Sequence, residues 1–518
     1  MTGSAAVLAV IRPPGRPGNG GARPWRAFAL LAVVQAMLST AASVTAIIGL
    51  DLAQDLSLSS SELVWANTSY LLAFAGLLLL GGRVADMVGW RPALVAGATV
   101  FAAGSLGAAL ATGPASLLLS RLLQGAGAAV AAPAAMALVG AVFPEVRARR
   151  RAMALWSGLP GVGAGAGLLL GGLCSTWASW RWAFALLAVL ILMVAAVVPR
   201  LVPAGAPGRR AAVDLPGAAL VSAGIALISY GAVAAGDRPW TAPLVALSFA
   251  AGTTLLVLFG LVESRARDPL LPPAVLRPRR RRVALVVAML PPTAGMTIAF
   301  LVSLYLRQVL GWSVLGTALA FVSYPVALAV GSLVGGPAVA RVGAPRAAAL
   351  GLVLMAAGMA VLSLITVDSS YLDTVLPGLV LAQVGAGIAS AAAVIVATDD
   401  VHPAQATVVG SLVNTAMLTG GTVGLAILTS LARARSGSLL DAAGPVATEG
   451  YAHAFRIAAI VFAIAAAIAV PLLRPDSRRA GDASIRATKP HLPETQPGAR
   501  SIPPTRLWGA PMSAESRG

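Results

Sequence analysis

The stretch GGRVADMVGWRPAL, residues 81–94, joins two long apolar runs and is the most informative connection in the chain. Gly82 and Gly89 allow a tight turn between two helix ends, and Asp86 and Arg91 add opposite charges to it. A carboxylate in such a turn can cap a helix or pair with an arginine. The spacing G-x-x-x-D-x-x-G-x-R therefore predicts a compact, charged connection between two membrane helices.

The composition of the whole chain indicates a membrane protein with many crossings. Of the 518 residues, 58% are hydrophobic and 11% are charged, whereas soluble proteins carry about a quarter charged residues. The apolar runs are long and continuous and lack the alternation of a membrane β-barrel. We therefore expect an all-α integral membrane protein with fourteen transmembrane helices, near residues 27–49, 63–81, 93–112, 116–143, 153–173, 182–200, 214–235, 242–262, 283–305, 316–340, 346–366, 375–397, 406–431 and 455–474.

The basic residues predict the orientation of these helices. Most of the 37 basic residues fall in the two tails and in alternate connections, which places both termini in the cytoplasm. The connection TDDVHPAQ, residues 398–405, is expected inside although it carries two acids and no basic residue. The predominance of arginine over lysine, together with the abundant alanine, indicates a GC-rich bacterial genome. We therefore expect a multi-pass protein of the bacterial cytoplasmic (inner) membrane.

Several function classes are excluded by what the sequence lacks. The net charge of +18 is explained by topology, and aromatic residues are not interleaved with the basic runs, so no nucleic acid is expected as a partner. The single cysteine, Cys174, excludes an internal disulfide and a cysteine-based metal cluster. The one lysine, Lys489, lies in the tail, so the chain has no P-loop, and the three histidines form no metalloprotease motif. We expect neither an enzyme nor a bound metal or cofactor.

An arginine interrupts the fourth apolar run, in the stretch LLSRLLQGAGAA, residues 118–129. Arg121, Gln124 and Gly125 are three or four residues apart and share one helix face. An ionisable group inside a membrane usually has a function and a partner. All nineteen acidic residues, however, fall near helix ends or in connections, so the sequence offers Arg121 no carboxylate at mid-membrane.

The fifth apolar run, LPGVGAGAGLLLGGL, residues 159–173, repeats glycine at every fourth position. Gly163, Gly167 and Gly171 therefore form a flat groove along one face of a helix, where a second helix can pack closely. No G-x-G-x-x-G frame fits, and the segment is a membrane helix, so it is not a nucleotide-binding loop.

These motifs resemble those of the major facilitator superfamily. Residues 81–94 resemble its loop signature, Arg121 to Gly127 resemble its second signature, and the glycine run resembles the antiporter motif of its exporters. Further stretches are similar to the fourteen-helix drug:proton antiporter family of the QacA/EmrB type: SWRWAF (179–184), DLPGAAL (214–220), VESRARDPLL (262–271), SLYLRQVLGWS (303–313) and GSLVNTAMLTGGTVGLAI (410–427).

The resemblance implies a major facilitator fold with two six-helix bundles and two extra central helices. It divides the chain into a disordered cytoplasmic tail (1–26), an N-terminal bundle (27–200), two linker helices with a basic cytoplasmic loop (201–282), a C-terminal bundle (283–474) and a second disordered tail (475–518). In such folds the substrate binds near the midplane, and the two bundles rock to expose it alternately to each side.

The family's usual first-helix aspartate, which is implicated in proton coupling, is replaced here by Ser39. Three interpretations of Arg121 therefore stay open. Neutral dipoles such as Ser39, Thr40, Gln124 and backbone carbonyls can balance it in a purely structural role. Alternatively it helps to bind an anionic or zwitterionic substrate. In the third interpretation it modulates a proton site elsewhere, such as Asp86 or Asp214 at the inner edge.

Two sets of site residues follow. Polar residues expected to line a cavity are Ser39, Ser43, Asn67, Tyr70, Arg121, Gln124, Trp156, Tyr305, Tyr324, Gln383 and Asn414. Residues expected in gating motifs are Gly82, Asp86, Gly89, Arg91, Gly125, Gly163, Gly167 and Gly171.

We therefore expect a secondary active transporter that exports organic small molecules, such as antibiotics or drugs, by alternating access. Its expected energy source is the proton gradient, its partners are the small-molecule substrate and the lipid bilayer, and it is expected to be a monomer. The missing first-helix acid leaves two alternatives: a facilitated-diffusion or uptake transporter, and a non-transporting membrane sensor.

Overall fold

The computed structural model describes residues 22–143, 145–202, 215–235, 238, 240–265, 273–399, 406–437, 439–440 and 444–473. Within these residues the regular structure is entirely helical. Both predicted tails lie almost wholly outside the described residues, except that the first helix begins at Ala22 and includes the last five residues of the predicted N-terminal tail.

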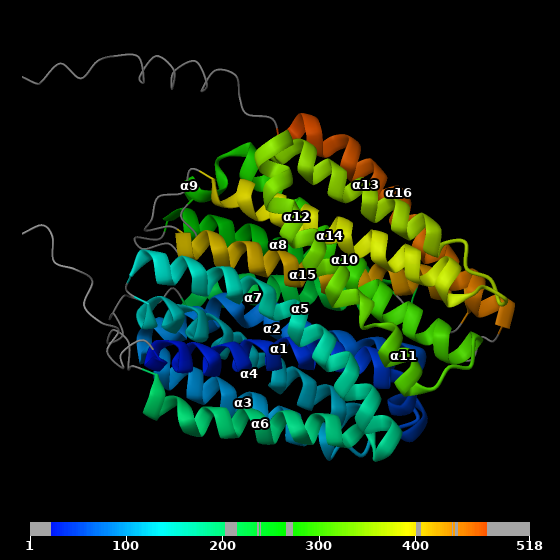
Figure 1. Cartoon of the computed structure of the whole chain (residues 1–518), viewed down its shortest axis with the longest axis horizontal. Coiled ribbons are helices and arrows are strands. Elements are labelled where there is room, and N and C mark those ends of the chain that lie inside the picture. The colour runs from blue at the N-terminus through cyan, green and yellow to red at the C-terminus, as the bar shows by residue number, and fades with distance from the viewer. Residues whose placement is uncertain are drawn as a thin grey trace, which may run out of the picture. The chain divides into compact units, whose positions relative to one another are not determined.

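Six long helices make up the first half of the chain (Figure 1). They are α1 (Ala22–Asp55), α2 (Ser60–Val88), α3 (Trp90–Ala109), α4 (Pro114–Val142), α5 (Val146–Trp177) and α6 (Trp180–Leu201). They are generally longer than the apolar runs, because polar ends continue the helical hydrogen bonding beyond the hydrocarbon. Short polar connections separate them, and Ser59 caps α2 in a reciprocal arrangement with Glu62.

Two helices and a single turn follow, namely α7 (Leu215–Ala234), α8 (Pro243–Arg265) and α9 (Pro273–Leu276). The α7 and α8 helices pack against each other, and α7 also contacts α2 of the first half and α15 of the second. This is the central position expected of two extra helices between the bundles.

The second half contains α10 (Arg279–Thr297), α11 (Val314–Ala320), α12 (Ser323–Val342), α13 (Ala344–Leu362), α14 (Leu376–Thr398), α15 (Ala406–Ser436) and α16 (Gly444–Leu473). Three π-helical turns extend them, η1 (Ile298–Val302) and η2 (Tyr305–Val309) after α10, and η3 (Tyr371–Val375) before α14. Figure 1 shows α10 and α12 to α16 gathered above α1 to α6.

The two halves repeat the same contacts. In the first, the Thr40 hydroxyl of α1 donates to the Gly163 carbonyl of α5 at 2.9 Å. In the second, the Thr293 hydroxyl of α10 donates to the Gly420 carbonyl of α15 at 2.8 Å. The turns α2–α3 and α12–α13 also match, since Gly89 and Gly343 both adopt positive φ angles, 100° and 82°.

Each of the fourteen predicted ranges contains a helix, but the number of crossings stays a prediction. Among the described residues, 12 helices are long and apolar enough to span a membrane by length and composition. The bent α2 raises the number to 13, and the apolar stretch of α7, Ala219–Ala232, is shorter than these.

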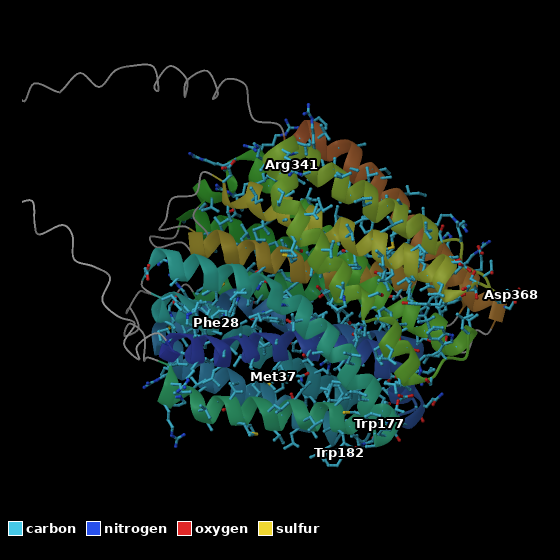
Figure 2. The ribbon with its side chains drawn as sticks, in the orientation of Figure 1. Phe28, Met37, Trp177, Trp182, Arg341 and Asp368 are labelled. Atoms are coloured by element: carbon cyan, nitrogen blue, oxygen red, sulfur yellow. The ribbon has the colours of Figure 1, made fainter. Side chains whose placement is uncertain are left out.

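The connections define two ends of the helix array. Trp177 and Asp368 lie towards one end and Arg341 towards the other, as Figure 2 shows. We call the end with Trp177 and Asp368 the outer end, after the predicted orientation, and the opposite end the inner end. At the inner end, Arg280 lies 3.6 Å from Asp399. Asp399 therefore receives a counter-charge from the start of α10, a pairing that the local sequence did not reveal.

Candidate functional site

A cavity of about 180 Å³ lies between the two halves. Its walls come from α1, α2 and α5 on one side and from α10, η1, α12 and α15 on the other. Twelve of its sixteen lining residues are apolar or glycine: Leu38, Ala42, Ala46, Leu71, Phe74, Pro160, Ala164, Leu168, Gly295, Met296, Ala299 and Leu418. The other four are Ser39, Ser43, Asn67 and Tyr324. Of the described residues, none that lines the cavity is charged.

The four polar residues differ in how much hydrogen-bonding capacity they leave for a ligand. Ser39 donates to the Gln35 carbonyl at 3.2 Å, and Ser43 donates to the Ala164 carbonyl at 2.9 Å. The Asn67 amide is 4% exposed and makes no hydrogen bond to the described residues. An amide so buried requires a partner. Because it lines the cavity, that partner can come from a bound molecule or from water.

Tyr324 of α12 lines the same cavity from the opposite half of the chain. Its hydroxyl makes no hydrogen bond to the described residues, and it lies where a side chain on Gly295 would stand. The glycine therefore makes room for the phenol at the cavity wall. Gln383 of α14 is buried, and its Nε2 lies near the same Gly295 position as the Tyr324 hydroxyl. That nitrogen finds no partner in the described part of the chain. Asn67 and Tyr324 thus present polar groups to one apolar cavity from both halves.

Arg121 lies outside this cavity, in a dry junction of four helices. Its Nε donates to the Ala66 carbonyl of α2 at 3.1 Å, and its Nη1 to the Ala41 carbonyl of α1 at 2.9 Å. The same Nη1 donates to Gln124 Oε1 at 2.5 Å, and Gln124 Nε2 donates in turn to the Ser105 hydroxyl of α3 at 2.7 Å. Both Arg121 and Gln124 are fully buried.

Neutral groups surround the Arg121 charge. Its guanidinium lies over the Tyr70 ring, 4.8 Å from the centroid, and 5.7 Å from the Phe184 centroid. Backbone carbonyls, an amide and two aromatic faces are all attractive to a cation. No carboxylate among the described residues pairs with it. Gln124 and backbone carbonyls balance the charge as in the first interpretation, whereas the Ser39 and Thr40 hydroxyls donate to backbone carbonyls instead.

The α5 glycines face two directions. A side chain on Gly163 would overlap the Ala36 carbonyl of α1, and one on Gly167 or Gly171 would also meet α1. A side chain on Gly165 or Gly172 would instead meet Pro325 of α12 or Ala318 of α11, in the other half. Gly165 and Gly172 belong to the same glycine run, but the sequence alone did not show that they face the other half.

The predicted connection 81–94 is helical except at Gly89, because α2 continues to Val88 and α3 begins at Trp90. Asp86 in the last turn of α2 and Arg91 in the first turn of α3 make separate contacts at the inner end. Asp86 is exposed and accepts a hydrogen bond from the Trp90 indole at 3.0 Å. Arg91 donates to the Pro199 carbonyl near the end of α6 at 3.3 Å. Gly82 approaches Pro133 of α4, so the turn is anchored on the first half alone among the described residues. Asp214, the other predicted proton site, lies outside the described residues.

Several residues predicted for the cavity lie elsewhere. The Tyr70 hydroxyl donates to the Leu38 carbonyl at 2.8 Å, and Gly125 packs on the Tyr70 backbone, so both belong to the α1–α2–α4 packing. Trp156 is buried against Phe28, 6.5 Å between ring centroids. Tyr305 donates to the Thr366 carbonyl at 2.6 Å towards the outer end. Asn414 is exposed on α15 and does not line the cavity. Aromatic and amide side chains can either pack between helices or bind a ligand, and their spacing in the sequence does not show which role each one has.

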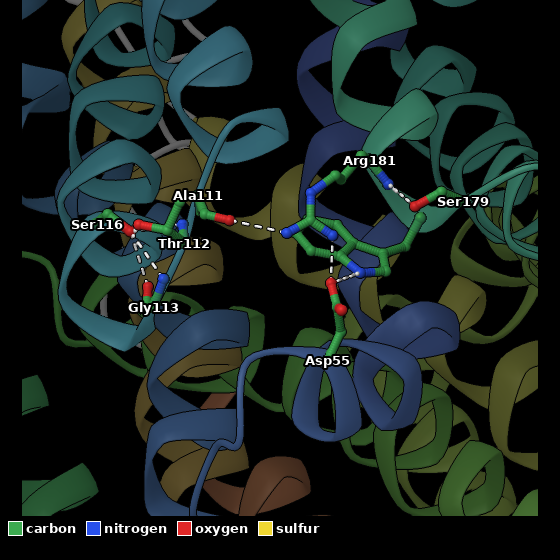
Figure 3. Close-up of polar contacts among 8 residues, drawn as sticks. Asp55, Ala111, Thr112, Gly113, Ser116, Ser179 and Arg181 are labelled. Atoms are coloured by element: carbon green, nitrogen blue, oxygen red, sulfur yellow. Dashed lines mark hydrogen bonds and ion pairs between the residues drawn. The ribbon is translucent and has the colours of Figure 1, made fainter.

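Two of the ion pairs at the outer end involve α1, and the sequence did not suggest them. Asp55 binds Arg181, which also donates to the Ala111 carbonyl at 3.0 Å, so this pair joins α1 and α6 to the connection between α3 and α4 within the first half (Figure 3). Asp51, one turn earlier on α1, lies 2.6 Å from Arg307 Nη2 of η2. This second pair joins the two halves. Both acids were expected near a helix end or in a connection, but their partners are 126 and 256 positions away in sequence.

The family model named Major Facilitator Superfamily matches residues 29–271 and 283–512. The chain belongs to this superfamily. The superfamily consists of membrane transporters, which confirms that the chain is a multi-span transporter of small molecules and not an enzyme.

Superfamily members similar in sequence include named resistance and export proteins. The puromycin resistance protein pur8 of Streptomyces alboniger is 35% identical over 486 residues, covering 90% of this chain and 95% of the relative. The cephamycin export protein CmcT of Amycolatopsis lactamdurans is 34% identical, covering 86% of this chain and 90% of the relative. Resistance and export proteins fit the predicted drug:proton antiporter type within the superfamily.

Solved structures support the fold alone. A bacterial homologue of the human lysosomal transporter Spinster, in an inward-facing and unoccupied conformation, superposes with a TM-score of 0.60 at 15% identity, covering 87% of this chain and 96% of that one. The nucleoside transporter NupG gives a TM-score of 0.60 at 12% identity, covering 86% and 100%. The major facilitator architecture predicted from the motifs is therefore confirmed.

Proposed function

We propose that the protein exports antibiotic-like organic molecules from a bacterial cell by alternating access, with the proton gradient as its energy source. The single observation that carries the proposal is the cavity between the halves, to which Asn67 and Tyr324 present unpaired polar groups from opposite sides. The relatives support it, because one is a puromycin resistance protein and another is a cephamycin export protein.

The chemistry of the cavity supports a substrate whose buried part is uncharged. An apolar wall with a few well-placed polar groups is the usual form of a small-molecule site. A charged group placed there would lose its hydration without gaining an opposite charge, and that exchange is unfavourable. The best substrate therefore has an apolar body and carries hydrogen-bonding groups that reach Asn67 and Tyr324.

The remaining features of the proposal follow from orientation and family. We propose fourteen crossings, with both termini in the cytoplasm of a bacterial inner membrane, and a monomer that needs no bound cofactor. Among the described residues no acid lines the cavity, so proton coupling has to act through carboxylates at the helix ends. Asp86 is exposed at the inner end and is accessible to cytoplasmic water.

Export is tested in bacteria that lack their own efflux pumps, with puromycin as the first probe. Cells expressing the protein should accumulate less puromycin than cells with an empty vector. Asn67→Ala and Tyr324→Phe should raise accumulation towards the empty-vector level, because each removes a polar group from the cavity. Asn414→Ala and Tyr230→Phe, at exposed positions that do not line the cavity, are the matched controls. Equal export by cavity variants and controls would contradict the assigned site.

The energy source is tested separately by collapsing the proton gradient with a protonophore. Proton-coupled export should stop, and accumulation should rise to the empty-vector level. Downhill transport that persists after the collapse would indicate facilitated diffusion instead. Absence of transport for puromycin, lincomycin and tetracenomycin alike would favour the membrane sensor.

A further inference from the structure

The absence of a side chain at Gly295 brings two polar groups together beside the cavity. Gly295 of α10 lines the cavity. A Cβ at this position would overlap the Tyr324 hydroxyl of α12 and would lie 3.9 Å from Gln383 Nε2 of α14. A residue with a side chain would therefore fill the space that the hydroxyl occupies. Three helices of the second half thus form one polar site, made of Gly295, Tyr324 and Gln383, which we call the Gly295 corner.

The two polar groups of the Gly295 corner differ in whether a ligand can reach them. Tyr324 lines the cavity and is half-buried. Gln383 is 1% exposed and does not line the cavity, and its Nε2 has no hydrogen-bond partner among the described residues. A buried donor without an acceptor is unfavourable. The Tyr324 hydroxyl is therefore the group that can contact a ligand, and the Gln383 amide is a buried donor next to it.

The chemistry of the two groups determines the direction of hydrogen bonding at this corner. An amide nitrogen only donates, whereas a phenolic hydroxyl both donates and accepts. Both atoms lie within 4 Å of the place where a Gly295 Cβ would stand, so a modest rotation of either side chain can join them. Once the Tyr324 oxygen accepts from Gln383 Nε2, its own hydrogen needs an acceptor. The described residues offer it none, so the acceptor has to enter from the cavity.

We propose that the Gly295 corner is a subsite for a neutral carbonyl group of the substrate. The Tyr324 hydroxyl donates to the carbonyl oxygen, and Gln383 Nε2 donates to the Tyr324 oxygen and so keeps the hydroxyl in its donating role. Gln383 is then a positioning residue, and Gly295 provides the space. The proposal rests on the export function assigned above and names its substrate class, uncharged carbonyl compounds with an apolar body.

The other polar residues of the cavity do not select for an acceptor in this way. The Asn67 amide both donates and accepts, so it can bind either kind of group. Ser39 and Ser43 use their hydrogens on the carbonyls of Gln35 and Ala164. Of the described lining residues, none is charged. The preference for a carbonyl oxygen should therefore depend on Tyr324.

The test compares three flat tricyclic compounds of nearly the same shape. At the same position fluorenone carries a carbonyl group, carbazole an N–H donor and fluorene a methylene group. Equilibrium dialysis against purified protein in nanodiscs measures their affinities, with empty nanodiscs correcting for uptake by lipid. Fluorenone should bind about twofold to tenfold more tightly than fluorene, the range expected for one neutral hydrogen bond.

Variants assign this preference to the Gly295 corner. Tyr324→Phe should weaken fluorenone binding by about the same twofold to tenfold and leave carbazole and fluorene unchanged. Gly295→Ala should also remove the preference, because its methyl group takes the place of the hydroxyl. Gly336→Ala of α12 is the matched control, since nothing lies within 4 Å of a methyl group there, and it should keep the wild-type preference.

Infrared difference spectroscopy tests the positioning role of Gln383. The carbonyl stretch of fluorenone moves to lower frequency when its oxygen accepts a hydrogen bond, and heavy-carbon labelling of that carbonyl separates its band from those of the protein. Tyr324→Phe should return the frequency to its value in an alkane. Gln383→Met should return it part of the way, because the hydroxyl loses the donor that polarises it. A purely structural Gln383 would change the affinity of all three compounds equally and leave the frequency unaltered.

Two results would overturn the subsite. In one, Tyr324→Phe keeps both the wild-type preference and the wild-type frequency. In the other, Tyr324→Phe weakens carbazole and not fluorenone, which would make the tyrosine an acceptor. Tyr324→Phe removes a single oxygen atom, so it carries the test even where Gly295→Ala fails to fold.

The binding measurement is independent of the export assay. A protein that prefers fluorenone through Tyr324 but exports no puromycin keeps the subsite and contradicts the proposed export. A protein that exports puromycin but binds fluorenone no better than fluorene contradicts the subsite and keeps the export.

Discussion

The Arg121 guanidinium lies over the ring of Tyr70, 4.8 Å from its centroid, while the Tyr70 hydroxyl donates to the Leu38 carbonyl at 2.8 Å. The two side chains therefore bind α1 at neighbouring positions, one from α4 and one from α2. The Arg121 side chain therefore joins neighbouring helices. Its removal should lower the stability of the protein more than its affinity for substrate.

Arg121→Ala should lower the thermal stability of the purified protein, because it removes the donors that join α1, α2 and α4. The loss expected for a fully buried polar network is on the order of 2–4 kcal/mol. Arg121→Lys should recover part of it, since lysine keeps the charge but lacks the forked donors. Thermal unfolding in detergent measures the effect, with Arg341→Ala at an exposed inner-end position as control. Wild-type stability combined with lost substrate binding would instead assign Arg121 to the substrate.

Gly163→Ala should destabilise the first half, because the added methyl group would overlap the Ala36 carbonyl of α1. Gly140→Ala is the matched control, since nothing lies within 4 Å of a methyl group there. Alanine is favoured over glycine inside a helix by roughly 0.5–1 kcal/mol, so the control should unfold at or above the wild-type temperature. Equal unfolding temperatures for the two variants would show that α5 and α1 are not closely packed.

Gly172→Leu should disturb transport without unfolding the protein, because its side chain would meet Ala318 of α11 across the two halves. The outer ends could then no longer close fully, and spin labels placed on the outer ends of the two halves should report a longer distance than in the wild-type protein. Gly260→Leu in α8, where nothing lies within 4 Å, should leave both distance and transport unchanged. Wild-type transport by the Gly172→Leu variant would show that transport does not require full closure of the outer ends.

Ser39→Asp should change which compounds the cavity accepts, because it adds a carboxylate to an uncharged wall. A permanent cation such as ethidium should then be exported better, and a neutral substrate worse. Ser39→Asn, of nearly the same shape and without the charge, should show neither change. Accumulation of ethidium and puromycin in the same cells measures both effects, and identical profiles for the aspartate and asparagine variants would contradict the electrostatic account.

Sequence patterns predicted the superfamily and the helix positions because these depend on local features. Apolar length fixes where a helix can cross the bilayer, and glycine spacing fixes which face can pack closely. Gly89 shows this well, since its turn requires the positive φ angle that the structure displays. Helix ends were less predictable, because polar residues such as those before Leu159 continue α5 well beyond the apolar run.

The cavity was only partly predictable, for a geometric reason. Ser39, Ser43, Asn67 and Tyr324 line it, whereas Arg121 and Gln124 share their polarity but point into the packing of the first half. Which way a polar residue points depends on how neighbouring helices are rotated, and one sequence does not determine that rotation. The Asp51–Arg307 pair was missed for the same reason, since its partners are 256 positions apart.

The matching clamps Thr40–Gly163 and Thr293–Gly420 make each half stiff. Between the halves, by contrast, many of the described contacts are small apolar groups that can slide past one another without breaking a hydrogen bond. Each half can therefore move as a rigid body against the other across a largely apolar interface. Most of the energy barrier to this movement should come from the few polar contacts at the outer end. A change in a single side chain there can therefore alter the rate of the whole transport cycle.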